Sequence, residues 1–522
     1  MFAAPAFTMT TRMSVADTSR TPSSAIQKRT PSYPAYLSLT LLAAIVVIAS
    51  LLRFHAIGQK NVWVDEGVSI ALARLDWYNF VRILWRHEAN MTLYYLFLRA
   101  WLPLGSSEAY IRTLSALFGI ATIPAVFALG RRMFDARVGL IASLLLAVNA
   151  YAIRYSQEAR SYSLYPLLCV LSTIYFLKYL QQSTRTNRIA YVVLSVLSVY
   201  AHFFAGLLIM AQYISVRLLD PKTVPSDIKK TWKHIAFSVT PLLIFVATTG
   251  VGVLRWVPRP RLSDLRTCFL FLTGNGGTVL TLLYAAAVAG AMAISLRRRL
   301  RRPFDFETWR YLFLFVWLAL PILFVFVISQ LKPLFVIRYF VFTIAALVIL
   351  AAAGLARIRP RFLGGAVLLV FAFLSFRGDT AFYQKDFDIS RDDWRAASRY
   401  VLARSQPGDV ILFHQPITRM PYEYYKSVTP AENPPTVIYP EHGARLMFRD
   451  FYAGRAPDAF LASIPAHYQR IWVALSYNQL PTGPDPTTRF ITDLFKKDYH
   501  AVTVREFPGI EVRLYSNAAE VP

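Results

Sequence analysis

Long apolar segments separated by short basic ones dominate the first 376 residues of this chain. A helix needs about 20 apolar residues to cross the hydrocarbon core of a bilayer. Inside lipid each backbone polar group must be satisfied within the protein, so such segments fold as a bundle of helices. The qualifying segments are Tyr36–Leu52, Ala109–Leu129, Val138–Ile153, Ser163–Leu180, Ile189–Leu219, His234–Leu254, Thr278–Leu296, Trp309–Ile328, Tyr339–Ala356 and Phe362–Phe376.

The segment Ile189–Leu219 is too long for one ordinary crossing and short for two. Cytoplasmic loops of membrane proteins carry an excess of Lys and Arg, and the basic groups here fall on one side only if this segment crosses twice. It would then turn near His202. We therefore expect roughly eleven helices, with the N-terminus cytoplasmic and the C-terminus extracytoplasmic, in the cell (inner) membrane.

The composition supports a membrane protein over a nucleic-acid-binding one. The net charge is +26, but only 16% of the residues are charged and 55% are hydrophobic. Most Lys and Arg residues stand in short loops beside apolar segments, where they orient helices and meet anionic lipid headgroups. Cys169 and Cys268 show no metal-binding or disulfide spacing, so both are interpreted as packing residues.

Three regions follow from this pattern. Residues 1–34 are rich in Ser, Thr, Pro and Ala and predict a disordered cytoplasmic tail. Residues 35–376 predict an all-α transmembrane domain with a large first outer loop, 53–108, and residues 377–522 predict a small extracytoplasmic α/β domain. The expected elements of that domain are helices Asp392–Arg404 and Thr488–Lys497 and strands Val410–His414, Thr436–Tyr439, Ile471–Ser476, Ala501–Phe507 and Glu511–Tyr515.

The first outer loop carries adjacent carboxylates, Asp65 and Glu66. Such a pair can supply a general base and an orienting or metal-binding group, although paired acids in a loop are usually just solvated. Further along, His87 and Glu88 precede Tyr94 and Tyr95. Acids and aromatic rings together can line a sugar site, and an amphipathic helix at the membrane interface explains the same residues.

Cations also stand in the predicted outer turns, where positive charge is disfavoured. Arg154 and Arg160 flank Glu158 in one turn, and Lys332 and Arg338 lie in another. A guanidinium group binds phosphate through two hydrogen bonds, which makes these residues candidate phosphate ligands. An internal salt bridge with Glu158 and snorkelling at the interface are the alternatives. His202, at its predicted turn, is either a packing residue or a metal or hydroxyl contact.

The ordered set of these motifs resembles the membrane glycosyltransferases of the GT-C superfamily, and more narrowly bacterial relatives of the protein O-mannosyltransferases and of the lipid A aminoarabinose transferase. The resemblance covers residues 35–215 most strongly. Its motifs are Trp63–Glu66, His87–Trp101, Tyr110–Gly119, Arg131–Phe134, Tyr155–Tyr162 and His202–Phe204, with Arg338-Tyr339, Asp393–Arg395 and Pro407–Asp409 later in the chain. Met91-Thr92 departs from the Pro-Pro pair common in such proteins, so substrate identity is not carried over.

The resemblance implies transfer of a hexose or pentose from a polyprenyl-phosphate donor to an acceptor hydroxyl on the extracytoplasmic face, with inversion, in cell-envelope glycan, glycolipid or protein glycosylation. Asp65 would be the catalytic base, with Glu66 beside it as a second catalytic residue. Arg160, Lys332 and Arg338 would bind the donor phosphate. His87, Glu88, Glu158 and His202 are acceptor or metal candidates.

A divalent metal ion is left open, and no nucleotide or redox cofactor is expected. The expected partners are the lipid-linked sugar donor, membrane lipid and an acceptor that is a lipid, a glycan or a protein, and no nucleic acid. Two other functions fit the sequence: a flippase or transporter of lipid-linked glycans, and a non-catalytic envelope binding protein. A transporter would need polar residues along the midplane, which these segments nearly lack.

Overall fold

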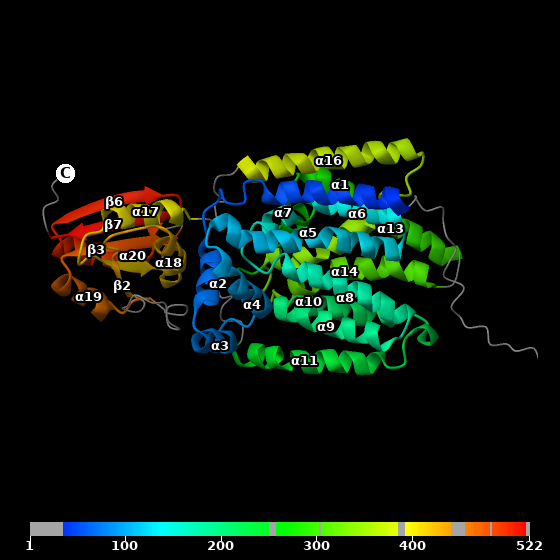
Figure 1. The fold of residues 1–522 in the computed structure, drawn as a ribbon, viewed down its shortest axis with the longest axis horizontal. Coiled ribbons are helices and arrows are strands. Elements are labelled where there is room, and N and C mark those ends of the chain that lie inside the picture. The colour runs from blue at the N-terminus through cyan, green and yellow to red at the C-terminus, as the bar shows by residue number, and fades with distance from the viewer. Residues whose placement is uncertain are drawn as a thin grey trace, which may run out of the picture.

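The structure is a computed structural model that describes residues 35–249, 257–301, 304–384, 392–439, 455–480 and 483–517. Its larger part is a bundle of helices that run side by side, and a sheet domain lies at one end of that bundle (Figure 1). The predicted fold class, a helical membrane domain followed by a small α/β domain, is confirmed. The predicted tail, residues 1–34, lies outside the described residues.

The long helices of the bundle follow the apolar segments closely. They are α1 (Ala35–Phe54), α5 (Glu108–Met133), α6 (Ala136–Ala147), α7 (Ala150–Ser156), α8 (Leu164–Gln181), α9 (Arg185–Ala201), α10 (Ala205–Val216), α11 (Ile228–Thr249), α13 (Thr278–Arg301), α14 (Phe306–Ile328), α15 (Ile344–Leu355) and α16 (Arg361–Gln384). A 3₁₀ helix, Ile337–Thr343, leads into α15. Eight of the described spans are long and apolar enough to cross a membrane, or nine if α6 and α7 form one bent span.

Two of the apolar segments are each divided into two helices. The segment Val138–Ile153 is broken between α6 and α7 with a bend of 64°. The Asn149 side chain caps α7 by accepting a hydrogen bond from the Ala152 amide, which fixes the start of a new helix there. The segment Ile189–Leu219 is two helices, α9 and α10, and α9 ends at Ala201, just before His202, near which the sequence predicted a turn.

Burial is distributed as expected for a protein solvated by lipid. Along α15, 83% of the apolar span is buried, whereas the corresponding share for α1 is 22%. Leu51 of α1 and Phe237 of α11 are among many large apolar side chains that face outward from the bundle. Apolar surface of this extent is stable against acyl chains and costly in water, so the chain is a multi-pass membrane protein.

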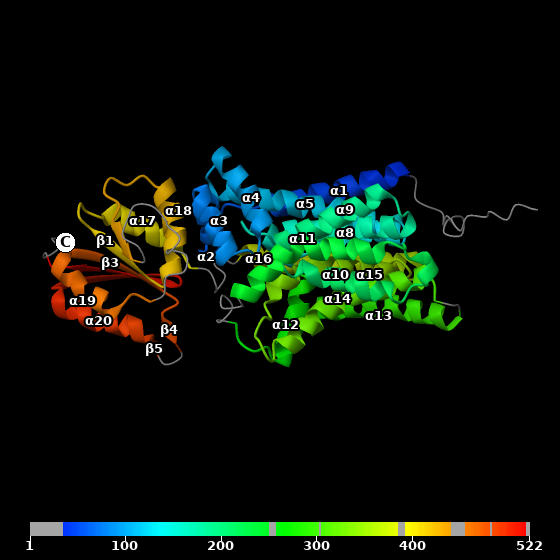
Figure 2. The ribbon, with the colours of Figure 1, turned by 90° about the horizontal axis from the view of Figure 1, so that it is seen from below.

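The first outer segment is helical where the sequence predicted a loop. It contains α2 (Val64–Arg74), α3 (Trp77–Arg86) and α4 (Thr92–Trp101). These helices lie at the end of the bundle, between it and the sheet domain, in both side views (Figures 1 and 2). A further short helix that the sequence did not predict, α12 (Leu262–Leu272), lies in the predicted outer loop 255–277.

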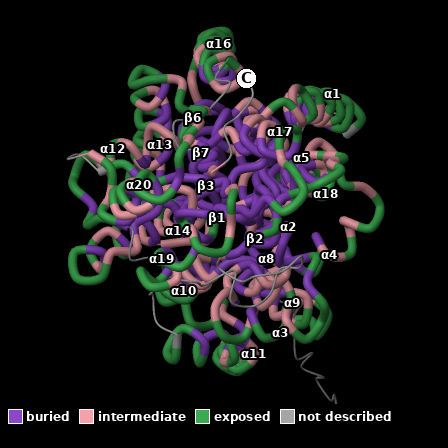
Figure 3. Tube along the Cα trace, turned by 90° about the vertical axis from the view of Figure 1, so that its left-hand side faces the viewer, coloured by how far each residue is buried: buried purple, intermediate pink, exposed green. Residues whose placement is uncertain are grey.

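The sheet domain contains all the predicted strands. It has five strands in the order β2-β1-β3-β7-β6, with β1, β2 and β3 parallel and the last two antiparallel. Their bounds are β1 (Val410–His414), β2 (Thr436–Tyr439), β3 (Arg470–Ser476), β6 (Ala501–Phe507) and β7 (Ile510–Ser516), and a short hairpin is formed by β4 (Gln479–Leu480) and β5 (Gly483–Pro484). Viewed end-on, the buried residues lie toward the centre and the exposed ones around the rim (Figure 3). Strand β1 is buried along its whole length, whereas the edge strand β6 is mostly intermediate or exposed.

The helices of this domain were predicted in part. Both expected helices are present as α17 (Trp394–Arg404) and α20 (Pro486–Asp498), while α18 (Arg419–Val428) and α19 (Asp458–His467) were not predicted. Helix α16 extends to Gln384, so the boundary expected after residue 376 falls inside a helix.

Candidate active site

The candidate site is built on the first turn of α2. Asp65 and Glu66 are its second and third residues, and their side chains point in different directions because successive residues of a helix are about 100° apart. Glu66 is completely buried and forms an ion pair with Arg112 of α5 at 2.7 Å. It also accepts a hydrogen bond from the Ala159 amide at 2.9 Å. Asp65 is partly exposed, with 27% of its side-chain surface accessible.

Arg112 connects Glu66 of α2 with the segment that precedes this helix. All five of its N–H groups are used: Nε and Nη2 donate to the two Glu66 oxygens, and the remaining donors reach three backbone carbonyls. Those carbonyls belong to Ile57, Lys60 and Asn61, in the segment just before α2. Glu66 is therefore placed to orient Asp65 and has no exposed surface with which to contact a substrate.

Two of the predicted phosphate ligands meet at Asp65. The Arg338 Nη2 atom lies 3.1 Å from Asp65 Oδ2, and the Arg160 Nη2 atom lies 4.0 Å from the same oxygen. The Arg160 Nη1 group also donates to Ser69 Oγ and to the Tyr95 hydroxyl. One partly exposed carboxylate and two guanidinium groups are thus brought together from three segments far apart in the sequence.

Aromatic rings surround the two arginines. The Arg338 guanidinium lies 5.6 Å from the centre of the Trp63 ring and 6.0 Å from that of Tyr162. Arg160 lies 5.9 Å from the Tyr162 ring. Cations at this range are attracted by aromatic faces, which helps to hold the guanidinium groups toward Asp65 and away from the lipid interface. This placement favours a site role for Arg338 over snorkelling.

Glu88 joins the same cluster. Its Oε1 atom accepts a hydrogen bond from the Tyr95 hydroxyl at 3.3 Å. Burial raises the pKa of Glu88 from 4.5 to about 7, the nearby Arg160 opposes this shift, and the nearby Asp65 adds to it. The carboxyl group therefore changes charge near neutral pH, next to the candidate base.

The raised pKa of Glu88 predicts how the stability of the protein depends on pH. Because the folded-state value of about 7 lies above the ordinary 4.5, folding favours the protonated acid. Its contribution is complete below about pH 4.5 and is lost as the pH rises through about 7. We expect the thermal midpoint of the wild type to fall relative to that of Glu88→Gln between about pH 5 and pH 8. An equal difference between the two proteins at both pH values would contradict this assignment.

His202 lies behind the cluster and is enclosed by aromatic rings. The ring centres of Tyr165 and Tyr339 are each 4.8 Å from that of His202. Its Nδ1 atom accepts a hydrogen bond from the Phe204 amide at 3.2 Å. Burial, and then the nearby Arg160 and Arg338, lower the pKa of His202 to about 3, so the ring is neutral. These contacts favour the packing interpretation of His202.

Three other predicted residues do not join the Asp65 cluster. Glu158 is buried and pairs with Arg154, with 3.6 Å between Oε1 and Nε, so the alternative of an internal salt bridge is realised with that arginine. His87 is the C-cap of α3, and burial, then Arg86 and Arg82, lower the pKa of its ring. Lys332 is exposed, and its side chain makes no hydrogen bond or ion pair within the described part of the chain.

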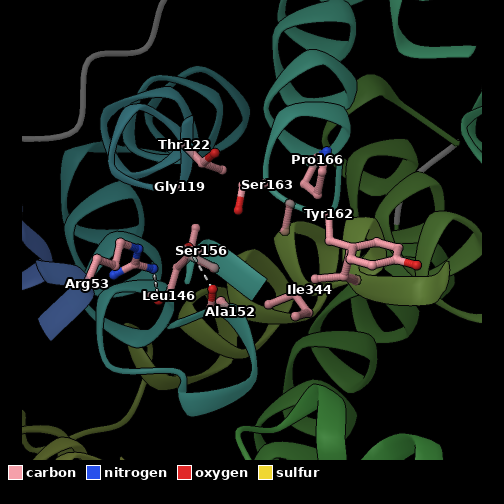
Figure 4. A pocket seen from close by; sticks show the side chains of 12 residues that line it. Arg53, Gly119, Thr122, Leu146, Ala152, Ser156, Tyr162, Ser163, Pro166 and Ile344 are labelled. Carbon is pink, nitrogen blue, oxygen red and sulfur yellow. Dashed lines mark hydrogen bonds between the residues drawn. The ribbon is translucent and has the colours of Figure 1, made fainter. Parts of the chain in front are cut away.

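A metal site is not assembled in the described residues, because no group of three or more His, Cys, Asp or Glu side chains there is close enough to hold an ion. Both cysteines are buried and unpaired. A small cavity is lined by Arg53, Ser156, Tyr162 and Ser163 among others (Figure 4). Its volume of about 30 Å³ is far below the roughly 300–1,000 Å³ of small-molecule pockets, so it suits ordered water.

Met91 shows why the sequence lacks the Pro-Pro pair expected before Leu93. It has a φ of 70° and immediately precedes α4. Proline is locked at a φ near −65° and does not adopt this conformation. The preceding Asn90 uses its Oδ1 atom to accept a hydrogen bond from the Phe203 amide at 3.1 Å. The loop thus has its own geometry, fixed against the turn at His202.

The comparisons with known proteins agree with this architecture. Residues 91–249 match the family described as dolichyl-phosphate-mannose-protein mannosyltransferase. The crystal structure of ArnT from Cupriavidus metallidurans in the apo state matches with a TM-score of 0.60 at 13% identity, covering 92% of this chain and 99% of that one. The chain therefore has the fold of ArnT.

Two further solved structures with this fold hold lipid phosphates. ArnT from Cupriavidus metallidurans bound to undecaprenyl phosphate matches with a TM-score of 0.61 at 12% identity, covering 93% of this chain and 99% of that one. The archaeal oligosaccharyltransferase AglB from Archaeoglobus fulgidus, in complex with an inhibitory peptide and a dolichol-phosphate, gives 0.52 at 11% identity, with coverages of 93% and 75%. No match was found among curated protein sequences.

Proposed function

We propose that this protein transfers a sugar from a polyprenyl-phosphate carrier to an acceptor hydroxyl. The observation that carries the proposal is the Asp65 carboxylate held between Arg338 and Arg160 at the end of the bundle. A base beside two guanidinium groups suits a reaction that removes a proton on one side and releases a phosphate on the other. The GT-C fold, with a lipid phosphate bound in a solved relative, supports the same chemistry.

In the proposed reaction Asp65 accepts the proton of the acceptor hydroxyl. The acceptor oxygen bonds to the anomeric carbon from the face opposite the phosphate, and the bond from that carbon to the phosphate oxygen breaks, so the anomeric configuration inverts. The lipid phosphate leaves as an anion, and Arg338 and Arg160 stabilise its charge. Glu66 and Arg112 orient Asp65 through their buried pair and touch no substrate.

The location of the site suits a donor with a lipid tail. Asp65, Glu88, Arg160 and Arg338 stand where the helices end, so the tail can remain among acyl chains while the phosphate reaches the guanidinium groups. We infer that this end of the bundle is extracytoplasmic, as the distribution of Lys and Arg predicts. A C-terminal reporter that is active only in the cytoplasm should therefore be silent.

The decisive experiment compares cell envelopes with and without the protein. Glycolipids, polysaccharides and glycoproteins from deletion cells and from complemented cells are analysed for one missing sugar. We expect the wild type to restore the sugar and Asp65→Asn to fail to restore it at equal membrane abundance. Identical envelopes in deletion and wild-type cells would reject the proposal.

Removing the Arg338 guanidinium is expected to weaken donor binding. Arg338→Gln keeps a polar side chain but loses the charge and the fork, so the apparent KM for the lipid donor should rise about 10–100-fold, the effect of losing a charge-assisted bond of roughly 1.5–3 kcal/mol. Initial transfer rates at varied donor concentration measure this value. Lys332→Gln is the matched control, because its exposed side chain contacts none of the cluster. Equal effects of the two substitutions would remove Arg338 from the donor site.

A further inference from the structure

The sheet domain has an edge where ligands commonly bind in open α/β sheets. The parallel strands lie in the order β2-β1-β3. The chain leaves β1 toward β2 on one side and leaves β3 toward the antiparallel strands on the other, so the order reverses between β1 and β3. Crevices at the carboxyl ends of strands beside such a reversal are the usual ligand sites. His414 ends β1 and Ser476 ends β3.

This edge faces the Asp65 site. Helix α18 follows β1 and packs on α2, and a Cβ atom at Gly67 would lie 2.6 Å from the backbone nitrogen of Pro421 in α18. On the other side of Asp65, the Val62 amide donates to the Tyr425 hydroxyl at 2.7 Å. The two views agree that α18 lies next to α2 (Figures 1 and 2). The sheet domain therefore touches the chain just before and just after the candidate base.

One aromatic residue of the sheet domain lies at this edge. Tyr477 follows β3, and 52% of its surface is exposed. Its neighbour Asp392 connects the two parts of the protein, because the Asp392 carbonyl accepts a hydrogen bond from the Asn61 side chain in the segment just before α2. Burial, and then Asp392 and Asp65, raise the pKa of the Tyr477 hydroxyl, while Arg338 opposes the shift. Asp392 is itself fixed by a hydrogen bond from Ser476 Oγ at 2.6 Å. The hydroxyl end of Tyr477 is thus held at the junction, and its ring remains accessible.

The backbone at Tyr477 is also unusual. Its φ of 56° lies in the left-handed region, which bulky residues rarely adopt. Unfavourable backbone conformations of this kind persist where the surrounding structure holds them, and they cluster at ligand-binding positions. This conformation occurs where the chain leaves β3 at the carboxyl edge of the sheet.

We propose that Tyr477, at the carboxyl edge of the parallel strands, forms the acceptor-side wall of the Asp65 site and that the acceptor bound there is a carbohydrate. This inference rests on the proposed glycosyl transfer. The C–H face of a sugar ring packs on an accessible aromatic ring, and its hydroxyls donate to carboxylates. The junction offers both, since the Tyr477 residue is half-exposed and the Asp65 carboxylate keeps accessible surface. Tyr477 is then a specificity-determining residue, distinct from the donor ligands Arg160 and Arg338.

The test measures acceptor and donor affinity separately in the full-length protein in lipid nanodiscs. The donor is a radiolabelled polyprenyl-phosphate-sugar fraction, and the acceptors are the glycolipid, polysaccharide and protein fractions of envelopes from deletion cells. Tyr477→Asn and Tyr477→Gly remove the ring with residues that tolerate a positive φ, so both should fold. Val504→Ala is the matched surface control, because it lies half-exposed on β6, two strands from β3.

We expect both ring-removing variants to raise the apparent KM for the active acceptor fraction about tenfold, with little change in kcat and in the KM for the donor. Tyr477→Phe should recover most of that loss, and Val504→Ala should behave as the wild type does. The active fraction should lose its acceptor capacity on periodate oxidation and keep it on protease digestion.

Three results would overturn the inference. An unchanged acceptor KM in folded Tyr477→Asn or Tyr477→Gly would remove Tyr477 from the acceptor wall. An equal rise in the donor KM would show that Tyr477 does not act on the acceptor alone. Loss of acceptor capacity on protease digestion would show that the acceptor is a peptide and not a carbohydrate. In these cases the wild type still transfers sugar and Asp65→Asn does not, so the proposed function stands. If the wild type transfers sugar to none of the fractions, the proposed function fails and this inference fails with it.

Discussion

Asp65→Asn is expected to reduce the rate of sugar transfer by at least about 10²–10⁴-fold, the range that a positioned general base contributes. Asparagine has nearly the same shape but cannot accept the acceptor proton. The protein should remain folded, because asparagine preserves the shape of the side chain and Arg160 keeps its hydrogen bonds to Ser69 and Tyr95.

The measurement is single-turnover transfer at saturating donor, with donor binding followed in parallel. Asp76→Asn is the matched control: it makes the same chemical change in the same outer segment, at the N-cap of α3, where Asn caps as well as Asp. Transfer by Asp65→Asn near the wild-type rate would mean that Asp65 is not the base. A loss of donor binding that accounts for the whole effect would make Asp65 an anchor for the two arginines instead.

The bundle could be predicted from the sequence because lipid leaves few alternatives. Apolar stretches such as Thr278–Leu296 and Trp309–Ile328 become helices in a bilayer whatever their neighbours are. The bounds of the strands Val410–His414 and Thr436–Tyr439 were also predicted correctly. Short β-branched and apolar runs between turn residues are typical of strands. In both cases the local pattern and the final structure depend on the same property, apolar burial.

The helices of the outer segment and the sheet domain were harder to predict. Helix α3 is rich in aromatic residues and arginine, and only Phe80 and Ile83 of its residues are buried. Helices α18 and α19 each contain a proline near one end, a residue usually taken to mark a turn. Tertiary contacts, such as that of α18 with α2, stabilise these elements, and no local pattern records them.

The sequence identified candidate side chains but could not say which of them meet. Asp65 and Glu66 are adjacent and chemically alike, yet one faces the cluster and the other is buried against Arg112. Lys332 and Arg338 are both cations of one outer turn, and the 3₁₀ helix beginning at Ile337 brings only Arg338 to Asp65. Such choices depend on the rotation of a helix and on its neighbours, which a single sequence does not specify. The sequence did not predict that Tyr477 lies near the site, because Tyr477 and Asp65 are more than 400 residues apart in the chain and no local pattern connects them.

Arg112→Met is expected to destabilise the protein by at least about 3–5 kcal/mol, the usual cost of breaking a buried ion pair by removing one partner. The Glu66 carboxylate would remain completely buried with no cation beside it. The carbonyls of Ile57, Lys60 and Asn61 would lose their donors as well. Unsatisfied buried polar groups each cost about 1–3 kcal/mol, so the loss should exceed that of a simple pair.

Glu66→Gln should be milder, because the guanidinium keeps its three carbonyl partners and one amide oxygen still accepts a hydrogen bond; we expect about 1–3 kcal/mol. Arg131→Met is the matched control, an exposed arginine at the far end of the same helix α5, with an expected effect within about 0.5 kcal/mol. Unfolding midpoints in detergent measure the stability of all three variants.

If Arg112 only stabilised the fold, transfer by the surviving folded protein would be normal. Because its donors hold the residues that lead into α2, we expect kcat to fall as well, with the donor KM changed less. Equal midpoints for Arg112→Met and Arg131→Met would show that the buried pair does not stabilise the fold, and an unchanged kcat would show that it does not hold Asp65 in place.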